Sequence, residues 1–78
     1  MLEKEFQYYK DHQKELVDKF EGKFIVIKGE RVIGSYESEI EAYEETKKVE
    51  ELGTFLIQLA LPGTENYTQT FHSRVSVN

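Results

Sequence analysis

The first twenty residues place apolar side chains at the spacing of a helix. The steps between them alternate between four and three residues, which puts the side chains on one helix face. Asp11 can cap a second helical piece, so a break near that residue is compatible with the pattern. Gly22 is a natural end, because glycine enters the left-handed conformation without a Cβ clash. The pattern predicts an amphipathic helix, whose face consists of Leu2, Phe6, Tyr9, Gln13, Leu16 and Phe20.

Residues 23–38, KFIVIKGERVIGSYES, contain two runs of β-branched and aromatic side chains separated by Gly29 and Glu30. Such runs predict a β-hairpin with a two-residue turn and glycine at the first turn position. Gly34 marks either a bulge or the close approach of another backbone. The turn predicts the cross-strand pairs Lys28–Arg31, Ile27–Val32 and Val26–Ile33.

A second helix is predicted from Ser38 to Gly53. Ser38 and Glu41 have the spacing of a capping box, and Gly53 is a typical end residue. Glu44 is placed to pair with Lys48 one turn further along the helix. One face of this helix is expected to be buried, and it consists of Ala42, Tyr43, Thr46 and Val49.

Two further strands follow. Residues 54–61, TFLIQLAL, form the most hydrophobic run, and Pro62 and Gly63 begin the loop after it. Apolar and polar side chains alternate along residues 67–77. This alternation predicts a strand with one packed face and one solvated face. The order α-β-β-α-β-β predicts an α+β domain with a four-stranded, antiparallel-rich sheet and two helices packed on one face. A right-handed crossover places the third strand beside the first, in the order 2-1-3-4.

The central strands are apolar on both faces. The run FIVI is entirely apolar, and the run FLIQLAL is apolar except for one glutamine. Such runs are typical of strands that are buried on both faces. Two short helices on one face would leave the other face open, so we expect a second copy of the chain to cover it. The sequence therefore predicts a homodimer that associates through its sheet.

The composition supports a single folded domain over residues 1–78. A chain of this length buries only about 60% of its unfolded surface, and it has no cysteine for a disulfide. Apolar residues make up 38% and charged residues 32%, a balance typical of a soluble globular protein. No apolar run approaches the roughly 20 residues of a membrane span, and the first residues do not resemble a signal peptide. We therefore expect a cytoplasmic protein that does not bind membranes.

The net charge of −5 is concentrated in one stretch, because residues 37–51 hold seven glutamates against two lysines. Nucleic-acid binding needs basic clusters that neutralise phosphates, so this balance argues against it. Glu41, Glu44 and Glu45 form an acidic face that is a candidate contact for a basic protein partner. The alternatives are an ordinary solvated surface, which is the commonest state of such carboxylates, and a metal or acid–base site, which no accompanying motif supports.

The polar C-terminal stretch is the main candidate for chemistry. Thr68, Thr70, His72 and Arg74 share one face of the predicted last strand, with Tyr36 as a candidate neighbour. They can form an anion or small-ligand site, or a weak hydrolase, and the alternative is a polar edge that discourages unwanted strand pairing. The serine that follows His72 points to the opposite strand face, which disfavours a serine hydrolase. The sequence predicts no catalytic residue, no metal site and no cofactor.

The stretch LVDKFEGKFIVIKGERVIGSYESEIEAYEETKKVEELGTFLIQ resembles a family of small bacterial and archaeal proteins catalogued as a domain of unknown function. The resemblance covers residues 6–58 and implies a compact α+β domain, but no activity. The features that carry it are Phe20, Gly22-Lys23-Phe24, Val32-Ile33-Gly34, Tyr36-Glu37-Ser38 and Glu41-Ala42.

Two functional hypotheses follow from the sequence. The first is a non-enzymatic interaction or accessory module that self-associates through its sheet. The second is a ligand-binding protein that uses the polar face of the last strand. The five tyrosines help to distinguish the two hypotheses. Exposed tyrosines would favour a protein interface, whereas buried tyrosines would indicate only core packing.

Overall fold

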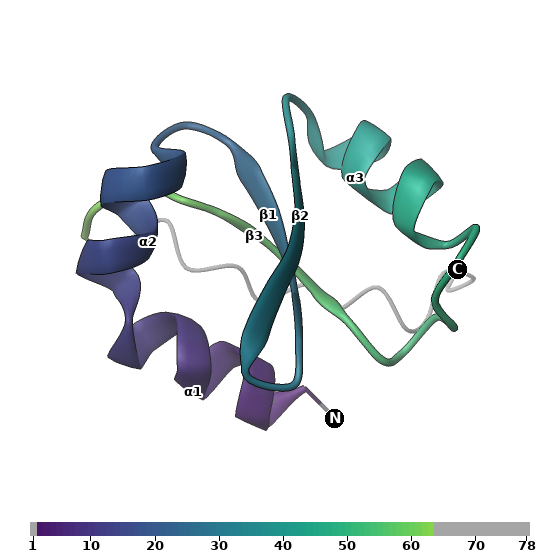
Figure 1. The fold of residues 1–78 in the computed structure, drawn as a ribbon, viewed down its shortest axis with the longest axis horizontal. Coiled ribbons are helices and arrows are strands. Elements are labelled where there is room, and N and C mark those ends of the chain that lie inside the picture. The colour runs from purple at the N-terminus through teal and green to yellow at the C-terminus, as the bar shows by residue number, and fades with distance from the viewer. Residues whose placement is uncertain (1, 64–78) are drawn as a thin grey trace.

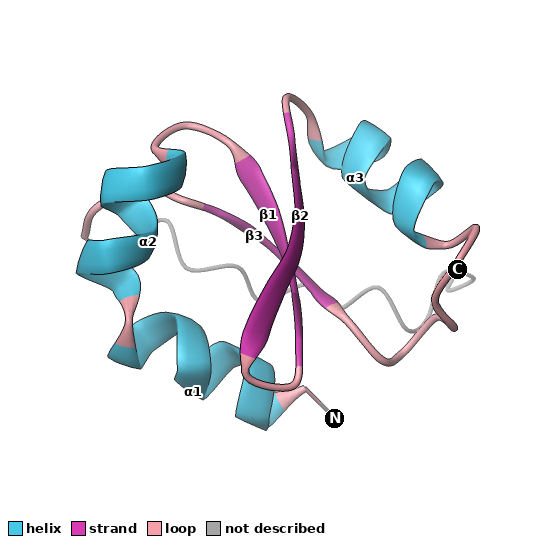
Figure 2. Ribbon diagram, in the orientation of Figure 1, coloured by secondary structure: helices cyan, strands magenta, loops and turns pink. Residues whose placement is uncertain are grey.

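A computed structural model describes residues 2–63. Three strands form one sheet in the order β2-β1-β3, and β1 runs antiparallel to both neighbours. Figures 1 and 2 show the helices of these residues around this sheet. The elements are α1 (Glu3–Asp11), α2 (Gln13–Phe20), β1 (Phe24–Lys28), β2 (Arg31–Tyr36), α3 (Glu39–Thr46) and β3 (Leu56–Leu59). The expected order of the first three strands is confirmed, whereas the expected fourth strand, residues 67–77, lies outside the described residues.

The helices cover both faces of the sheet, so the expectation that they share one face is wrong. Successive side chains of β1 point to opposite faces. Ile25 and Ile27 belong to a buried cluster with Tyr9 and Leu16 of the first two helices. Val26 belongs to a second cluster, described below, on the opposite face. Figure 1 shows α1 and α2 on one side of the strands and α3 on the other.

The second cluster removes the reason for expecting a second copy over an open sheet face. Val26 and Phe55 are 0% exposed and Ile57 is 1% exposed. Ala42 of α3 packs with them, and it is also 0% exposed. Burying apolar side chains in this way is worth about 25 cal/mol per Å² of apolar surface removed from water. A single chain therefore hides the apolar side chains of both sheet faces among its described residues.

The amphipathic pattern of the first twenty residues is confirmed, and the helix is broken where a break was compatible with the pattern. His12 separates α1 from α2, with φ −117° and ψ 18°. Leu2, Tyr9 and Leu16 are buried, and Tyr9 and Leu16 pack on the sheet. The break lets one continuous apolar stripe follow the curved surface of the sheet in two straight pieces.

The hairpin is confirmed, together with two of its three predicted pairs. Gly29 has φ +66°, a value that favours glycine at the first turn position. A β-bulge follows the pair Ile27–Val32, so Val26 pairs with Gly34 and not with Ile33 as predicted. The bulge adds one residue to β2 and interrupts its hydrogen-bond ladder with β1.

The second helix begins as predicted and ends earlier than predicted. The Ser38 hydroxyl accepts a hydrogen bond from the Glu41 backbone N–H at 3.2 Å, which confirms the cap. The helix ends at Thr46, seven residues before Gly53. Two glutamates in the expected last turn would have met the negative end of the helix dipole. Val49 lies in the turns that follow and is 78% exposed, so its expected burial is wrong.

Candidate functional site

The free edge of β2 is the most distinctive surface in the described part of the chain. Among residues 2–63, β2 pairs with β1 on one side and with no strand on the other. The β2 edge, defined here as residues 31–37, has a charged residue at each end, Arg31 and Glu37. The five residues between them are uncharged and have polar or apolar side chains that are half-buried or exposed. An unpaired strand presents backbone N–H and C=O groups that another strand can bind.

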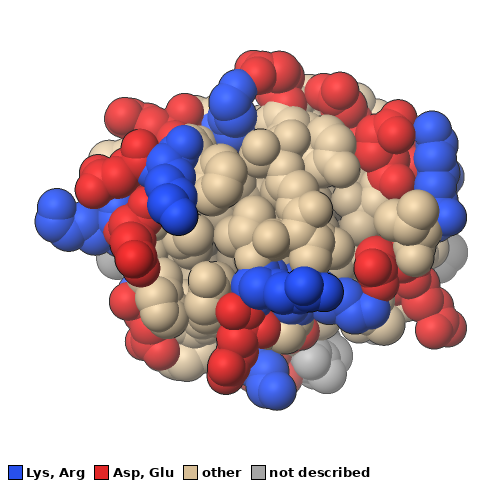
Figure 3. All heavy atoms as spheres, viewed as in Figure 1, with Lys and Arg blue, Asp and Glu red and all other residues tan. Residues whose placement is uncertain are grey.

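Figure 3 looks at the molecule from the side of β2. Uncharged atoms fill the middle of this face, and acidic and basic side chains surround them. Half-buried apolar side chains of β2 belong to both cores, with Val32 against the α1 and α2 side and Ile33 against the α3 side. Protein interfaces commonly combine such an uncharged centre with a charged rim.

Gly34 and Tyr36 give the middle of the β2 edge a fixed shape. A Cβ atom at Gly34 would lie 3.0 Å from both Cε2 and the hydroxyl oxygen of Tyr36. The tyrosine ring therefore packs over the glycine on its own strand, and a larger residue at position 34 would push it away. Gly34 is thus explained by the close approach of a side chain, in addition to the neighbouring bulge.

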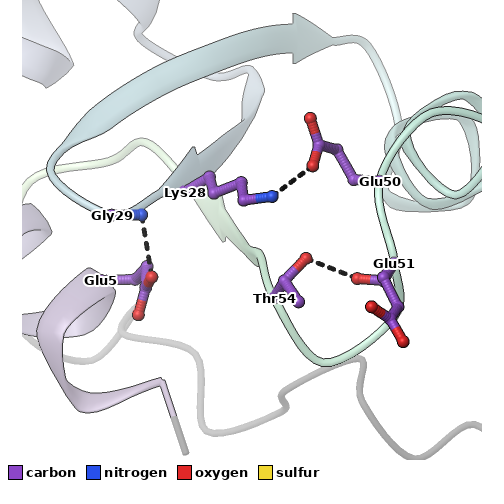
Figure 4. A network of polar contacts seen from close by, with 6 residues as sticks. All are labelled: Glu5, Lys28, Gly29, Glu50, Glu51 and Thr54. Carbon is purple, nitrogen blue, oxygen red and sulfur yellow. Dashed lines mark hydrogen bonds and ion pairs between the residues drawn. The ribbon is translucent and has the colours of Figure 1, made fainter.

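The hairpin end of the edge is held from both helical layers (Figure 4). A carboxylate oxygen of Glu5 on α1 accepts a hydrogen bond from the Gly29 backbone N–H at 2.8 Å. Lys28, beside the turn, forms an ion pair with Glu50 in the segment after α3. Within that segment, Thr54 donates its hydroxyl hydrogen to the backbone oxygen of Glu51. These contacts fix the start of β2 relative to α1 and to the segment that leads into β3.

The two charged ends of the β2 edge differ in their contacts. Glu37 forms an ion pair through Oε2 with Lys23, and its side chain remains 77% exposed. Arg31 is exposed and forms no side-chain ion pair with another of residues 2–63. An exposed ion pair contributes little to stability, about 0–1 kcal/mol. Both end charges are therefore accessible to a partner.

Comparison with known proteins identifies a family. Residues 15–60, more than half of the chain, match the family of unknown function DUF5678. The chain belongs to DUF5678. No curated protein and no solved structure matches it. The part of the chain that defines DUF5678 membership runs from α2 to the end of β3, so it includes the entire β2 edge.

The acidic face predicted from the sequence lies on α3 of this DUF5678 protein, but its carboxylates do not converge. Glu44 pairs with Lys47 at 3.3 Å and Glu45 pairs with Lys48 at 3.2 Å. The predicted pairing of Glu44 with Lys48 is therefore wrong. A carboxylate oxygen of Glu41 accepts a weak hydrogen bond from a backbone N–H at 3.4 Å. No group of three potential metal ligands occurs within residues 2–63.

Most of the predicted ligand site lies outside the described residues. This holds for Thr68, Thr70, His72 and Arg74, and the ligand-binding hypothesis for them stays a prediction. Tyr36 lies within the described residues, where its ring is half-buried in the cluster beneath α3. Its position is accounted for by packing, and the β2 edge that it borders was not foreseen as a site.

His12 caps the break between the first two helices. Its ring stacks on Tyr8 with the ring centroids 4.4 Å apart. Its Nδ1 lies 3.0 Å from the backbone oxygen of Tyr8, and its backbone N–H donates to the same oxygen. Carbonyl groups at a helix end need such donors. The histidine is exposed.

None of the helices within residues 2–63 has the combination of length and apolar character that crossing a bilayer requires. The helices of this DUF5678 protein are short and carry charges on their outer faces. Their apolar sides are occupied by contacts with the sheet.

Proposed function

We propose that this DUF5678 protein is a non-enzymatic interaction or accessory module that self-associates through the β2 edge. Strand addition to a free edge supplies main-chain hydrogen bonds, while side chains on either side provide specificity. The observation that carries the proposal is a free edge whose middle is uncharged. Edge strands that avoid pairing usually carry charged residues or prolines in that position.

The distribution of tyrosines supports an interface more than a purely structural role. Tyr9 is fully buried, whereas Tyr8, Tyr36 and Tyr43 are half-buried and retain accessible surface. Tyrosine combines a large apolar ring with a hydrogen-bonding hydroxyl, which suits protein interfaces. Tyr8 on α1 and Tyr43 on α3 pack against the two clusters, and Tyr36 lies on β2 itself, so the β2 edge offers an aromatic contact as well as main-chain groups.

The bulge in β2 sets the expected strength of the interaction. Bulges and short strands restrict edge pairing, and β2 has six residues and one bulge. We therefore expect a weak association, with a dissociation constant on the order of micromolar or higher, as is typical of small transient interfaces.

A cytoplasmic location is part of the same proposal, since the absence of cysteine fits a reducing compartment.

The substitution Ser35→Lys tests the proposal. Ser35 is exposed in the middle of the β2 edge, so a lysine there places a charge where a partner strand would pair. Gln7→Lys on α1 is the control, because it makes the same change of charge at an exposed position away from the edge. The measurement is molar mass by sedimentation over a range of concentrations, combined with NMR of the β2 amides on dilution.

We expect the wild type and Gln7→Lys to associate with rising concentration, with the largest shifts at the β2 amides. Ser35→Lys should remain monomeric and folded. A wild-type protein that is monomeric at every concentration contradicts self-association. Equal behaviour of the two variants contradicts the assignment to the β2 edge.

A further inference from the structure

The charges at the ends of the β2 edge are opposite in sign. Arg31 begins the strand, Glu37 follows its last residue, and the residues between them carry no charge. When two copies of such a strand lie antiparallel, the positive end of each meets the negative end of the other. When they lie parallel, like charges meet at both ends, which is unfavourable. The edge is therefore complementary to itself in the antiparallel direction.

We propose that two copies pair antiparallel along β2, with Arg31 of each copy beside Glu37 of the other and Gly34 at the two-fold axis. This inference rests on the proposed self-association and specifies its direction and register. A symmetric pair of this kind uses the same surface twice, as most homodimers do. It would join two three-stranded sheets into one continuous sheet.

Both end charges are available for these contacts. Arg31 is exposed and has no ion-pair partner among the described residues. The Glu37 carboxylate is 77% exposed and uses Oε2 for Lys23, so Oε1 remains open to a guanidinium from the second copy. Lys23 restrains the carboxylate near the strand end before any partner arrives. Each carboxylate would then lie between two cations.

The middle of the edge fits the same register. With Gly34 opposite its own copy, Val32 lies opposite Tyr36 and Ile33 lies opposite Ser35. The bulge leaves Val32 on the α1 and α2 side and Tyr36 on the α3 side, so these two side chains do not pack on each other, and the end charges carry the register. The Tyr36 ring occupies the space that a side chain at Gly34 would fill, so the two copies would meet through their backbones at the axis. No charge is placed opposite an apolar side chain in this arrangement.

The bulge explains why the end charges are needed to select this register. One extra residue in β2 disturbs the regular alternation of N–H and C=O groups along the edge. The ladder alone therefore does not place Arg31 of one copy beside Glu37 of the other. Two symmetric ion pairs at the ends favour one register over the others.

A charge-reversal experiment tests the register. Arg31→Glu alone and Glu37→Arg alone each place like charges at both ends of the paired strands. Each should weaken the homodimer about tenfold to a hundredfold, because two favourable pairs become unfavourable. Mixing the two single variants in equal amounts should restore association, since every end then meets the opposite charge. Combining both substitutions in one chain should restore the homodimer.

Matched controls separate the contact from general effects of charge. Lys14→Glu on α2 changes the charge as Arg31→Glu does. Glu44→Arg on α3 changes the charge as Glu37→Arg does, and it also removes one exposed ion pair, that with Lys47. Both positions are exposed and lie outside the β2 edge. We expect both controls to associate as the wild type does, and circular dichroism establishes that every variant is folded.

The outcomes distinguish this inference from the proposed function. A wild-type dimer that tolerates both single reversals overturns the antiparallel register and leaves association through the edge intact. Single variants that weaken association but do not restore it when mixed also overturn the register. A wild type that does not associate at all overturns the proposed self-association and this inference with it.

Discussion

At the scale of single residues, the buried carboxylate of Glu5 on α1 has a structural role at the hairpin turn. Glu5 is 9% exposed, and its carboxylate accepts a hydrogen bond from the Gly29 backbone N–H. Without this acceptor, the turn N–H would lose its hydrogen bond to water and form no hydrogen bond within the protein, which is unfavourable. The carboxylate therefore connects α1 to the turn that starts the β2 edge.

Removal of this acceptor should destabilise the domain. We expect Glu5→Ala to lower the free energy of unfolding by about 1–3 kcal/mol, because the partly buried Gly29 N–H is left unpaired. Glu5→Gln retains an acceptor oxygen and should lower it by less. Urea denaturation provides the measurement, with Glu15→Ala at an exposed position of α2 as the control. Equal losses for the alanine and glutamine variants would show that the hydrogen bond is not the cause.

Among the elements, α3 depends most on its local contacts because it has only eight residues. Helices this short are not stable alone in water. Its start is capped by Ser38, and its last turn and C-terminal flank are bridged by the Glu44–Lys47 and Glu45–Lys48 pairs. Ala42 and Thr46 attach it to the sheet, since both are almost fully buried.

Loss of the cap should be measurable at this scale. We expect Ser38→Ala to cost about 1 kcal/mol of stability, because the Glu41 N–H loses its acceptor. Ser35→Ala is a suitable control, since Ser35 is exposed on β2 and caps no helix. Thermal unfolding followed by circular dichroism gives the difference. A control that loses as much as Ser38→Ala would contradict the role of the cap.

At the scale of the whole molecule, one small sheet supports two separate cores. Ile25 points into the cluster with α1 and α2, while Ile57 points into the cluster with α3. A chain of this size has only a narrow margin of stability, roughly 5–15 kcal/mol. Both cores contain residues of β1 and β2, so losing either one should unfold the entire domain.

Matched substitutions on the two faces test this arrangement. Ile25→Val and Ile57→Val each delete one methylene group and should each cost about 0.5–1.5 kcal/mol. The loss relative to the wild type should not depend on protein concentration, because α3 of the same chain covers Ile57. Chemical denaturation at several concentrations provides the measurement. A cost for Ile57→Val that shrinks on dilution would instead indicate that a second copy covers that face.

Much of the fold could be predicted from local patterns. The helix start at Ser38 and the turn at Gly29 depend on neighbouring residues alone, and both are confirmed. A break in the first helical stretch was only compatible with the pattern; it falls at His12, and Asp11 is the last residue of α1 and does not cap α2. The bulge could be expected near Gly34 but not positioned, because its location depends on how β1 and β2 twist together. The predicted order 2-1-3-4 placed β2 at an edge, but no local motif identified that edge as a site, and among residues 2–63 the outer side of β3 is unpaired as well.

The sequence by itself determined the order of the elements and the apolar character of both sides of β1 and β3. It did not determine which side each helix covers. Ile25 and Val26 are equally apolar and point in opposite directions, so the strand pattern is the same for either choice. Only the tertiary structure decided that α3 crosses on the side opposite α1 and α2, because that choice depends on the chain path and on packing between distant residues.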